Sequence, residues 1–395
     1  MINETMYQLG SAPSAIRELF AYGLARKAEI GEDKVFDFSI GNPSVPAPAL
    51  VAETIAELIK LPAEQLHAYS SSAGLDSTRE AIANNLNKRF KTSYSAENLY
   101  LTMGAAASLS ACFTAIVEPG LGNEIIVISP YFPEYKVWIS CAGATCVEVP
   151  ARADNFQIDT EAVAKAITPQ TRGIVINSPN NPVGTVYTRQ TLEALAAVLN
   201  EKQAEYGHEI YLISDEPYRE LVYGGAEVSW VPSLYNNTLV CYSWSKSLSM
   251  PGERIGYVLV PNQVNDWKKV YLAVCGAGRS LGYVCSPVLF QRVIEKCVDE
   301  PADIEAYEKN RKLLTDILDE FGYEYISPDG AFYLWIKALE EDAQAFSDRA
   351  KKHELLLVAS DSFGVGGWVR AGYCIDSQTI INSKEAFAAL KKEYE

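Results

Sequence analysis

Between residues 98 and 260, apolar segments of strand length alternate with segments of helix length, and this alternation constrains the fold more than any other feature of the chain. The strand-like segments are almost continuously apolar: NLYLTMG, EIIVI, GIVINSP, YLISDEP, TLVCYSWSK and RIGYVLV. Strands that are apolar on both faces are typical of a mostly parallel sheet with helices on both sides. The sequence therefore predicts an α/β fold whose large domain has a mostly parallel central sheet covered by helices.

The pattern changes near residue 280. From there onward, helical segments and the strand-like segments AFYLWIK, LLLVASD and WVRAGYCI follow one another in an α+β order. A chain of 395 residues is also too long for one small core. We therefore expect a large domain up to residue 279 and a smaller α+β domain over 280–395. Near the N-terminus, apolar periodicity predicts a helix over 12–29.

The composition excludes several classes of function. The chain has 34 basic and 50 acidic residues, a formal net charge of −16, which argues against a nucleic-acid-binding surface. The N-terminus lacks the regions of a signal peptide, and no stretch approaches the roughly 18 apolar residues of a membrane span. The eight cysteines form no C-x-x-C pair and the three histidines lie far apart, so we expect reduced cysteines, no metal site and no Ser-His-Asp triad. These features predict a cytoplasmic protein.

The polar motifs of the large domain follow strand-like segments, and in open parallel sheets ligands bind beyond the carboxyl ends of the strands. The segment SWSKSLSMPGERIGY, 243–257, carries Ser243, Lys246 and Arg254 between two apolar strands. Burial and neighbouring cations lower the pKa of a lysine, which favours imine formation. Two other interpretations stay open for these residues alone: a solvated loop lysine, or an acyl-transfer serine in the SxxK spacing, which no partner motif accompanies.

Two further motifs follow strands. Asp215, in SDEPY, could pair with a protonated pyridine nitrogen, or it could cap a helix. Asn181, in NSPNNPVG, is held out of the α region by Pro182. Its amide could donate to a phenolate-type oxygen, or the segment could be an ordinary Asn-Pro turn.

Two features predict sites for anions. The segment TMGAAAS, 102–108, combines a strand, a glycine and a helix start, where backbone N–H groups bind anions, although such junctions occur in every α/β protein. Arg370 lies in the apolar segment WVRAGY and could bind a carboxylate. A structural ion pair is the alternative, because a buried arginine is costly without an anion.

Taken in order, these motifs resemble those of the fold-type I, class I/II aminotransferases that depend on pyridoxal phosphate, the family of aspartate aminotransferase. The resemblance runs from GNP at 41–43 to Arg370, and SPNNPVG, SDEPY, SWSKSLSMPGERIGY and WVR nearly match family signatures. The matching positions are Gly41, Tyr69, Gly104, Ala105, Ala106, Phe132, Asn181, Asp215, Tyr218, Ser243, Lys246, Arg254 and Arg370.

The resemblance implies a large cofactor-binding domain over 45–279 and a small domain in which residues 1–44 join residues 280–395. It implies pyridoxal 5′-phosphate as the cofactor, held by Lys246 as a Schiff base, with Lys246 later moving the substrate proton. By the same resemblance, Asp215 would hold the ring nitrogen protonated and make the ring an electron sink.

Other positions acquire roles from the resemblance alone. Tyr218 and Asn181 would bind the ring oxygen, and Phe132 would stack on the ring. Arg370 would bind the α-carboxylate of the substrate, aided by Asn181 and by the backbone near Gly41.

The resemblance assigns the phosphate group to the backbone of Gly104, Ala105 and Ala106 and to the side chains of Ser243 and Arg254. Tyr69 matches the tyrosine that reaches the phosphate of the neighbouring subunit. A homodimer with shared active sites is therefore implied, with no nucleic acid and no membrane as partner.

The implied reaction moves an amino group between an L-amino acid and a 2-oxo acid. Some aspartate-using relatives have a lysine where this chain has Ala106, and in another branch an arginine of the neighbouring subunit binds the distal carboxylate of the substrate. Arg279, in CGAGRSLGY, could match that arginine and favour aspartate or glutamate. A surface or interface arginine is the other interpretation.

Two alternatives to a transaminase stay open. Carbon–sulfur β-lyases use the same fold and residues, although they usually differ after the lysine. A non-catalytic protein that senses the cofactor or has a structural role is the alternative from a different class, but all expected catalytic positions are filled in this chain.

Overall fold

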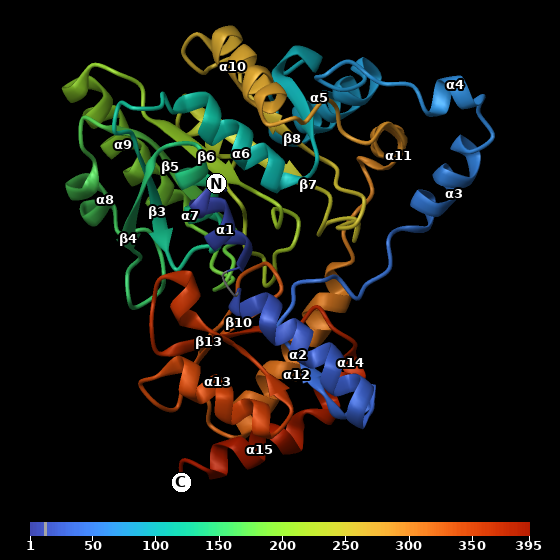
Figure 1. The fold of residues 1–395 in the computed structure, drawn as a ribbon, viewed down its shortest axis with the longest axis vertical. Helices are drawn as coiled ribbons and strands as arrows, with labels where there is room; N and C mark the ends of the chain where they lie inside the picture. The colour runs from blue at the N-terminus through green and yellow to red at the C-terminus, as the bar shows by residue number, and fades with distance from the viewer. Residues whose placement is uncertain (12–13) are drawn as a thin grey trace. The chain divides into compact units, whose positions relative to one another are not determined.

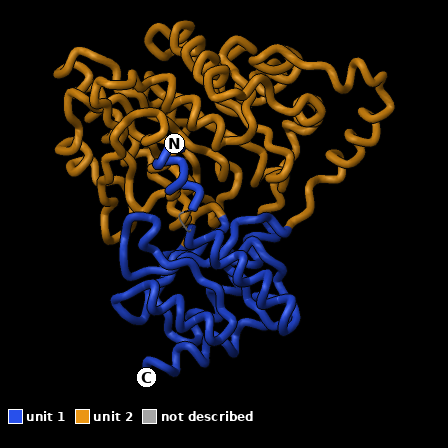
Figure 2. Tube along the Cα trace, viewed as in Figure 1, with its two compact units in different colours: residues 1–44, 305–327, 332–395 blue, residues 45–304, 328–331 orange. Residues whose placement is uncertain are grey.

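The computed structural model describes residues 1–11 and 14–395; residues 12 and 13, where the helix expected over 12–29 begins, lie outside the described residues. The chain forms two compact units (Figure 2). The large unit comprises Val45–Ile304 and Pro328–Ala331, and the small unit comprises Met1–Ser44, Glu305–Ser327 and Phe332–Glu395.

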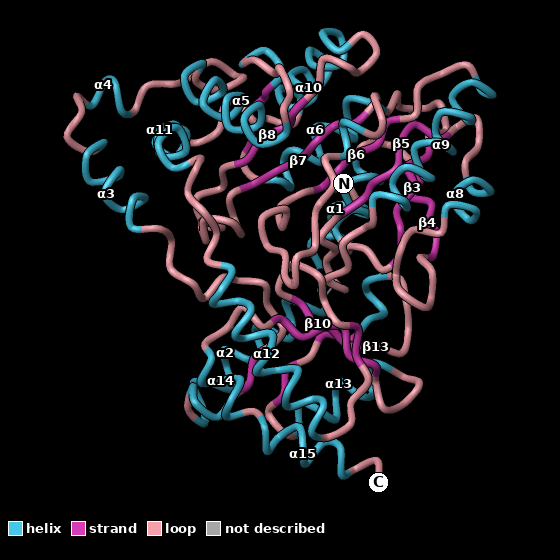
Figure 3. Tube along the Cα trace, turned by 180° about the vertical axis from the view of Figure 1, so that it is seen from behind, coloured by secondary structure: helices cyan, strands magenta, loops and turns pink. Residues whose placement is uncertain are grey.

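A seven-stranded sheet forms the centre of the large unit, as the strands in Figures 1 and 3 show. Its order is β2 (Leu99–Thr102), β8 (Gly256–Leu259), β7 (Thr238–Ser243), β6 (Tyr211–Asp215), β5 (Thr171–Asn177), β3 (Glu124–Ser129) and β4 (Thr145–Pro150). Neighbouring strands from β7 to β4 run parallel, whereas β8 is antiparallel to both β7 and β2. The expected mostly parallel central sheet is confirmed.

Helices surround this sheet. They are α3 (Ala49–Leu58), α4 (Ala63–Leu66), α5 (Asp76–Phe90), α6 (Ala105–Ile116), α7 (Glu134–Cys141), α8 (Thr160–Ala166), α9 (Arg189–Tyr206), α10 (Trp267–Ser280) and α11 (Val288–Cys297), with the short 3-10 helices η2 (Ala96–Asn98) and η3 (Val231–Ser233).

Successive side chains of the strands enter different apolar cores, because neighbouring residues of a strand point to opposite faces. In β3, Ile125 packs in the core of α6, α7 and α10, whereas Ile126 packs in the core of α8 and α9. In β7, Cys241 joins the first of these cores, whereas Tyr242 joins a third core with α5 and α11. Both faces of the sheet are therefore covered, which explains why its strands are apolar throughout.

The strand register brings the polar motifs to one edge of the sheet. Asp215, at the end of β6, pairs with Asn177 of β5 and with Cys241 of β7. Ser243, at the end of β7, lies opposite Gly256 of β8, which in turn lies opposite Thr102 of β2. Since β2 and β7 are both antiparallel to β8, their carboxyl ends share this edge with those of β5 and β6.

The small unit contains two sheets. The order β12 (Val358–Ala359), β13 (Trp368–Gly372), β10 (Tyr333–Lys337) and β9 (Tyr325–Ile326) forms an antiparallel sheet, and β1 (Phe36–Asp37) pairs with β11 (Leu355–Leu356) in parallel. Its helices are α1 (Glu4–Ser11), α2 (Ala15–Ile30), α12 (Ile304–Glu320), α13 (Ala343–Lys352), α14 (Ser377–Asn382), α15 (Lys384–Lys392) and the 3-10 helices η1 (Glu32–Lys34) and η4 (Ser360–Phe363).

The compact units divide the chain later than the residue 280 expected from sequence. Residues 280–304 lie in the large unit. The reason is α11, whose buried residues Val293, Ile294 and Cys297 pack in the core with α5 and the sheet. The change to an α+β pattern therefore precedes the boundary between the units by one helix.

Other expectations concern cysteines, metals and membranes. All eight cysteines are free thiols. Across residues 1–11 and 14–395, no cluster of three or more His, Cys, Asp or Glu side chains is arranged to hold a metal ion. Within the same described residues, no helix is both long enough and apolar enough to cross a membrane.

Candidate active site

Lys246 lies in a buried turn that connects β7 to β8. Trp244 and Leu248 of this turn are buried in the core that contains α5 and α11. Ser245 and Ser247, the neighbours of Lys246, are buried as well, and Lys246 itself is half-buried. The surroundings of Lys246 therefore differ from those of a solvated loop lysine.

The Asp215 carboxyl is buried at the end of β6, and its two oxygens differ. Oδ2 accepts a 2.5 Å hydrogen bond from the Tyr135 hydroxyl of α7, whereas Oδ1 has no hydrogen-bond partner among the residues that the structure describes. Burial raises the pKa of the Asp215 carboxyl to about 7, although the Tyr135 hydrogen bond opposes this shift. Residues 216–230 form turns and irregular segments rather than an α-helix, so Asp215 is not a helix cap.

Asn177 connects the Asn181 loop to the backbone of Asp215. Its Nδ2 donates to Asp215 O at 2.8 Å, and its Oδ1 accepts from Asn181 N at 2.7 Å. Tyr218 is buried three residues beyond Asp215. The structure therefore brings Asn181, Asp215 and Tyr218 to the same edge of the sheet.

Gly104 and Arg254 lie against each other where β2 leads into α6. Gly104 has φ +81°, and a Cβ at this position would lie 2.7 Å from Arg254 Nη2. Arg254 Nη1 donates to Pro251 O at 2.9 Å, and Nη2 donates to Met103 O at 3.4 Å. The absence of a side chain at Gly104 therefore allows a guanidinium to lie beside the start of α6.

The start of α6 adds backbone donors to this guanidinium. Ala105 and Ala106 open the helix, and the cap residue Gly104 has no side chain that could accept a hydrogen bond from its first N–H groups. Such N–H groups and the helix dipole favour an anion. Ser243 is buried at the end of β7. It pairs with Gly256 of β8, which lies two residues after Arg254. A phosphate group fits this combination of donors and positive charge.

In the small unit, the structure brings Gly41 and Arg370 together around Tyr333. The Arg370 guanidinium carbon lies 4.4 Å from the centre of the Tyr333 ring and 5.1 Å from that of Phe363. Its Nη2 donates to Ser39 O at 2.7 Å. A Cβ on Gly41 would overlap the Tyr333 hydroxyl, so only glycine fits there. Arg370 is thus oriented by aromatic rings and a carbonyl.

Phe132 adjoins the Asp215 group through Tyr135, whereas Tyr69 and Arg279 have exposed positions. Phe132 packs edge-on against Tyr135 and Trp138, with ring centres 5.8 and 5.9 Å apart. Tyr69 is 87 % exposed. Arg279 is exposed in the last turn of α10.

Sequence reasoning missed Tyr135 and Asn177. Tyr135 lies three residues after Phe132 in SPYFPEY, and its spacing from Phe132 could have indicated a shared face of a helix. Nothing local indicates that its hydroxyl meets a carboxyl 80 positions away. Asn177 could have been noticed as the polar residue that ends an apolar strand.

The family model of the class I and II aminotransferases matches residues 33–386. The chain belongs to this family. It is therefore an aminotransferase, and members of the family use pyridoxal phosphate. The alternative of a carbon–sulfur β-lyase is not favoured, because the similar proteins are named as aminotransferases.

Several family members are similar over most of their length. The aspartate/prephenate aminotransferase of Thermus thermophilus is 31% identical over 358 residues, 88% of this chain and 89% of that protein. An arginine–pyruvate transaminase of Pseudomonas aeruginosa is 31% identical over 376 residues, 91% of this chain and 90% of the relative. Among solved structures, an amino transferase from Eubacterium rectale has a TM-score of 0.97 at 54% identity and covers 100% of this chain and 99% of its own. The Thermus thermophilus aspartate aminotransferase with maleate has a TM-score of 0.87 at 29% identity, over 99% of this chain and 100% of its own.

Proposed function

We propose that Lys246 binds pyridoxal phosphate covalently at the carboxyl edge of the large sheet. The observation that carries this proposal is the buried Asp215 carboxyl, in which Tyr135 holds Oδ2 and Oδ1 is left for another donor. A protonated pyridine nitrogen is such a donor, and its charge would offset the burial that raises the pKa of Asp215. When bound, the cofactor supplies an aldehyde carbon that bonds to amines and an electron-withdrawing ring.

The remaining groups of the cofactor have matching partners in the large unit. We assign the phosphate to the backbone of Gly104, Ala105 and Ala106 and to the side chains of Ser243 and Arg254. We assign the ring oxygen to Asn181 and Tyr218, and the ring face to Phe132. The close approach of Arg254 to the glycine before α6 supports the phosphate assignment.

In the proposed reaction the chain performs three tasks. Lys246 Nζ would take up the proton from the α-carbon of the amino acid and hold it for the return transfer. Asp215 Oδ1 would accept a hydrogen bond from the ring nitrogen and keep that nitrogen protonated. Arg370 binds the α-carboxylate of the substrate, with Asn181 and the backbone near Gly41 as further donors.

We also propose that the enzyme acts as a homodimer with shared sites in the cytoplasm. Tyr69 supports the dimer, because its side chain is 87 % exposed and therefore accessible to another subunit. Exposed apolar side chains elsewhere in the large unit are consistent with a buried contact: Ile59, Leu272, Leu281 and Val284. The free cysteines support the cytoplasmic location.

Lys246→Ala tests the proposed site. We expect this variant to lose both transamination and the absorbance band of the lysine-bound cofactor. A panel of amino acids and 2-oxo acids, with the band followed for each, would measure this and would identify the substrates of the unmodified enzyme. A Lys246→Ala protein with full activity would contradict the proposal.

Arg279 is the residue from which we infer the class of amino acid that the enzyme uses. We propose that its exposed guanidinium binds the distal carboxylate of aspartate or glutamate in a neighbouring subunit. Arg279→Ala should then lower kcat/KM for aspartate about a hundredfold more than for alanine, since a charged hydrogen-bond partner is lost. Equal losses for both amino acids would remove Arg279 from substrate choice.

A further inference from the structure

A group of buried polar side chains lies beside the segments that carry the proposed active-site residues; we call it the rear network. Four of its members are sequence neighbours of proposed site residues: Glu216 of Asp215, Arg219 of Tyr218, Tyr242 of Ser243, and Ser247 of Lys246. The fifth member, Glu220, follows Arg219. In β7, Tyr242 and Ser243 point to opposite faces, because side chains alternate along a strand.

One half of the rear network is a buried ion cluster around Arg219. The guanidinium contacts Glu216 Oε2 at 3.0 Å and Glu220 Oε1 at 3.1 Å. Its carbon lies 4.3 Å from the centre of the Tyr242 ring. The side chains of Arg219 and Glu216 are only 4% and 2% exposed. The segment that follows Asp215 is therefore held to the ring of Tyr242.

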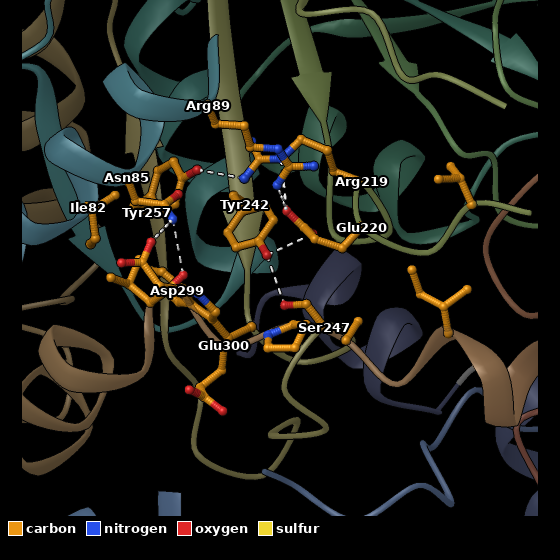
Figure 4. Close-up of a pocket in the computed structure, with 16 residues that line it drawn as sticks. Ile82, Asn85, Arg89, Arg219, Glu220, Tyr242, Ser247, Tyr257, Asp299 and Glu300 are labelled. Atoms are coloured by element: carbon orange, nitrogen blue, oxygen red, sulfur yellow. Dashed lines mark hydrogen bonds and ion pairs between the residues drawn. The ribbon is translucent and has the colours of Figure 1, made fainter. Parts of the chain in front are cut away.

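The other half is a chain of hydrogen bonds that ends beside Lys246. Glu220 Oε2 accepts from the Tyr242 hydroxyl at 2.9 Å. The same hydroxyl lies 2.8 Å from Ser247 Oγ. Figure 4 shows Tyr242 between Glu220 and Ser247, with an interaction to each. Through these bonds the segment that follows Asp215 is joined to the turn that carries Lys246.

These hydrogen bonds lie beside a cavity, where they help to fix the positions of Glu220, Tyr242 and Ser247. The cavity has a volume of about 450 Å³, and Glu220, Tyr242 and Ser247 are among the residues that line it (Figure 4). The Tyr242 ring also packs in the core with Trp244 and Tyr257, so these residues lie between a packed core and a cavity. On the cavity side, directed hydrogen bonds add to packing in restricting the position of a side chain and its backbone.

Stability alone is a weak explanation for the rear network. Removing two charges from water costs free energy that their attraction often only balances, so a buried ion pair adds little net stability over apolar residues. A network that instead joins two catalytic segments restricts their relative position, and catalysis is sensitive to displacements of about 1 Å.

We infer that Glu220, Tyr242 and Ser247 are positioning residues, which hold the Lys246 amine where it can bond to the cofactor aldehyde. This inference rests on the proposed function of Lys246. It predicts a selective effect: loss of the rear network weakens the capture of an aldehyde by Lys246, but not the binding of the ring and phosphate.

Tyr242→Phe provides the test, because it removes the hydroxyl and keeps the ring under Arg219. The cofactor-free protein would be titrated with pyridoxal phosphate and with pyridoxamine phosphate, which has the same ring and phosphate but no aldehyde for Lys246. We expect the Kd for pyridoxal phosphate to rise about tenfold and that for pyridoxamine phosphate to stay within about twofold. Equal weakening of both ligands, or of neither, would overturn the inference.

Three variants complete the design. Tyr235→Phe removes another buried tyrosine hydroxyl, bound to Ile210 O at 2.6 Å, and should leave both Kd values unchanged. Ser247→Ala should reproduce the selective loss even if Tyr242→Phe does not fold, and Ser247→Thr, which keeps a hydroxyl, should restore binding. Lys246→Ala should abolish the preference for pyridoxal phosphate. If Lys246→Ala still prefers pyridoxal phosphate, the proposed function of Lys246 is wrong. If Lys246→Ala loses the preference but Tyr242→Phe keeps it, only the role of the rear network is wrong.

Discussion

At the scale of single residues, Asp215 shows how environment selects a role. An aspartate after a strand is by itself compatible with a helix cap, and the sequence alone leaves that possibility open. The structure removes it, because no α-helix follows and the carboxyl is buried. One oxygen is held by Tyr135, and burial raises the pKa of the carboxyl to about 7. A buried acid with one remaining acceptor position suits a cationic ring nitrogen.

This environment predicts a pH-dependent stability of the cofactor-free protein. The folded state binds a proton at Asp215 more tightly than the unfolded state, so the contribution of Asp215 to stability is greatest below pH 4 and is lost as the pH rises to about 7. The shift from 3.8 to about 7 corresponds to about 4 kcal/mol at most. Asp215→Asn should remove this loss, because an amide does not titrate. The free energy of unfolding in urea should therefore fall between pH 5 and pH 8 for the unmodified protein and fall less for the variant. Parallel pH profiles would contradict the prediction.

At the scale of elements, the junction between β2 and α6 depends on geometry around one glycine. The sequence predicts a strand, a glycine and a helix start, and the structure contains all three in that order. The family resemblance assigns both Gly104 and Arg254 to the phosphate, but only the structure shows that Arg254, 150 residues later, lies directly against Gly104. That contact depends on the antiparallel pairing of β8 with β2, which local patterns do not encode.

Gly104→Ala tests this junction. The substitution places a Cβ 2.7 Å from Arg254 Nη2 at φ +81°, so Arg254 or the start of α6 must move. We expect the Kd for pyridoxal phosphate to rise about fivefold or more, because strained positions of this kind cost of order 1–3 kcal/mol. Gly120→Ala is the matched control, since Gly120 has φ +86° but no atom within 4 Å of the new Cβ. If both variants bind the cofactor equally, the junction does not hold the phosphate.

At the scale of the whole molecule, each unit gathers its own group of proposed site residues. The large unit brings the cofactor residues to one sheet edge, and the small unit gathers Gly41 and Arg370 around Tyr333. Tyr69 contributes to neither group and is exposed. A second subunit is the element that would give Tyr69 a role.

The dimer is tested through Tyr69. Sedimentation equilibrium should give twice the mass of one chain for both the unmodified protein and Tyr69→Phe. The variant should bind pyridoxal phosphate about tenfold more weakly, since a hydrogen bond to a charged phosphate is lost. A monomer that binds the cofactor with unchanged affinity would contradict shared active sites.

The sequence by itself determined the class of fold and the identity of most proposed site residues. Continuous apolar strands that alternate with helices require a covered, mostly parallel sheet, and polar motifs after such strands indicate a site at the carboxyl edge. Only the tertiary structure decided which residues are in direct contact: Tyr135 with Asp215, Gly104 with Arg254, and Tyr242 with Ser247, the neighbour of Lys246. The structure also shows that the second segment of the small unit begins after α11. The physical reason is that periodicity encodes the burial of each segment, whereas contacts between distant residues depend on strand order and register.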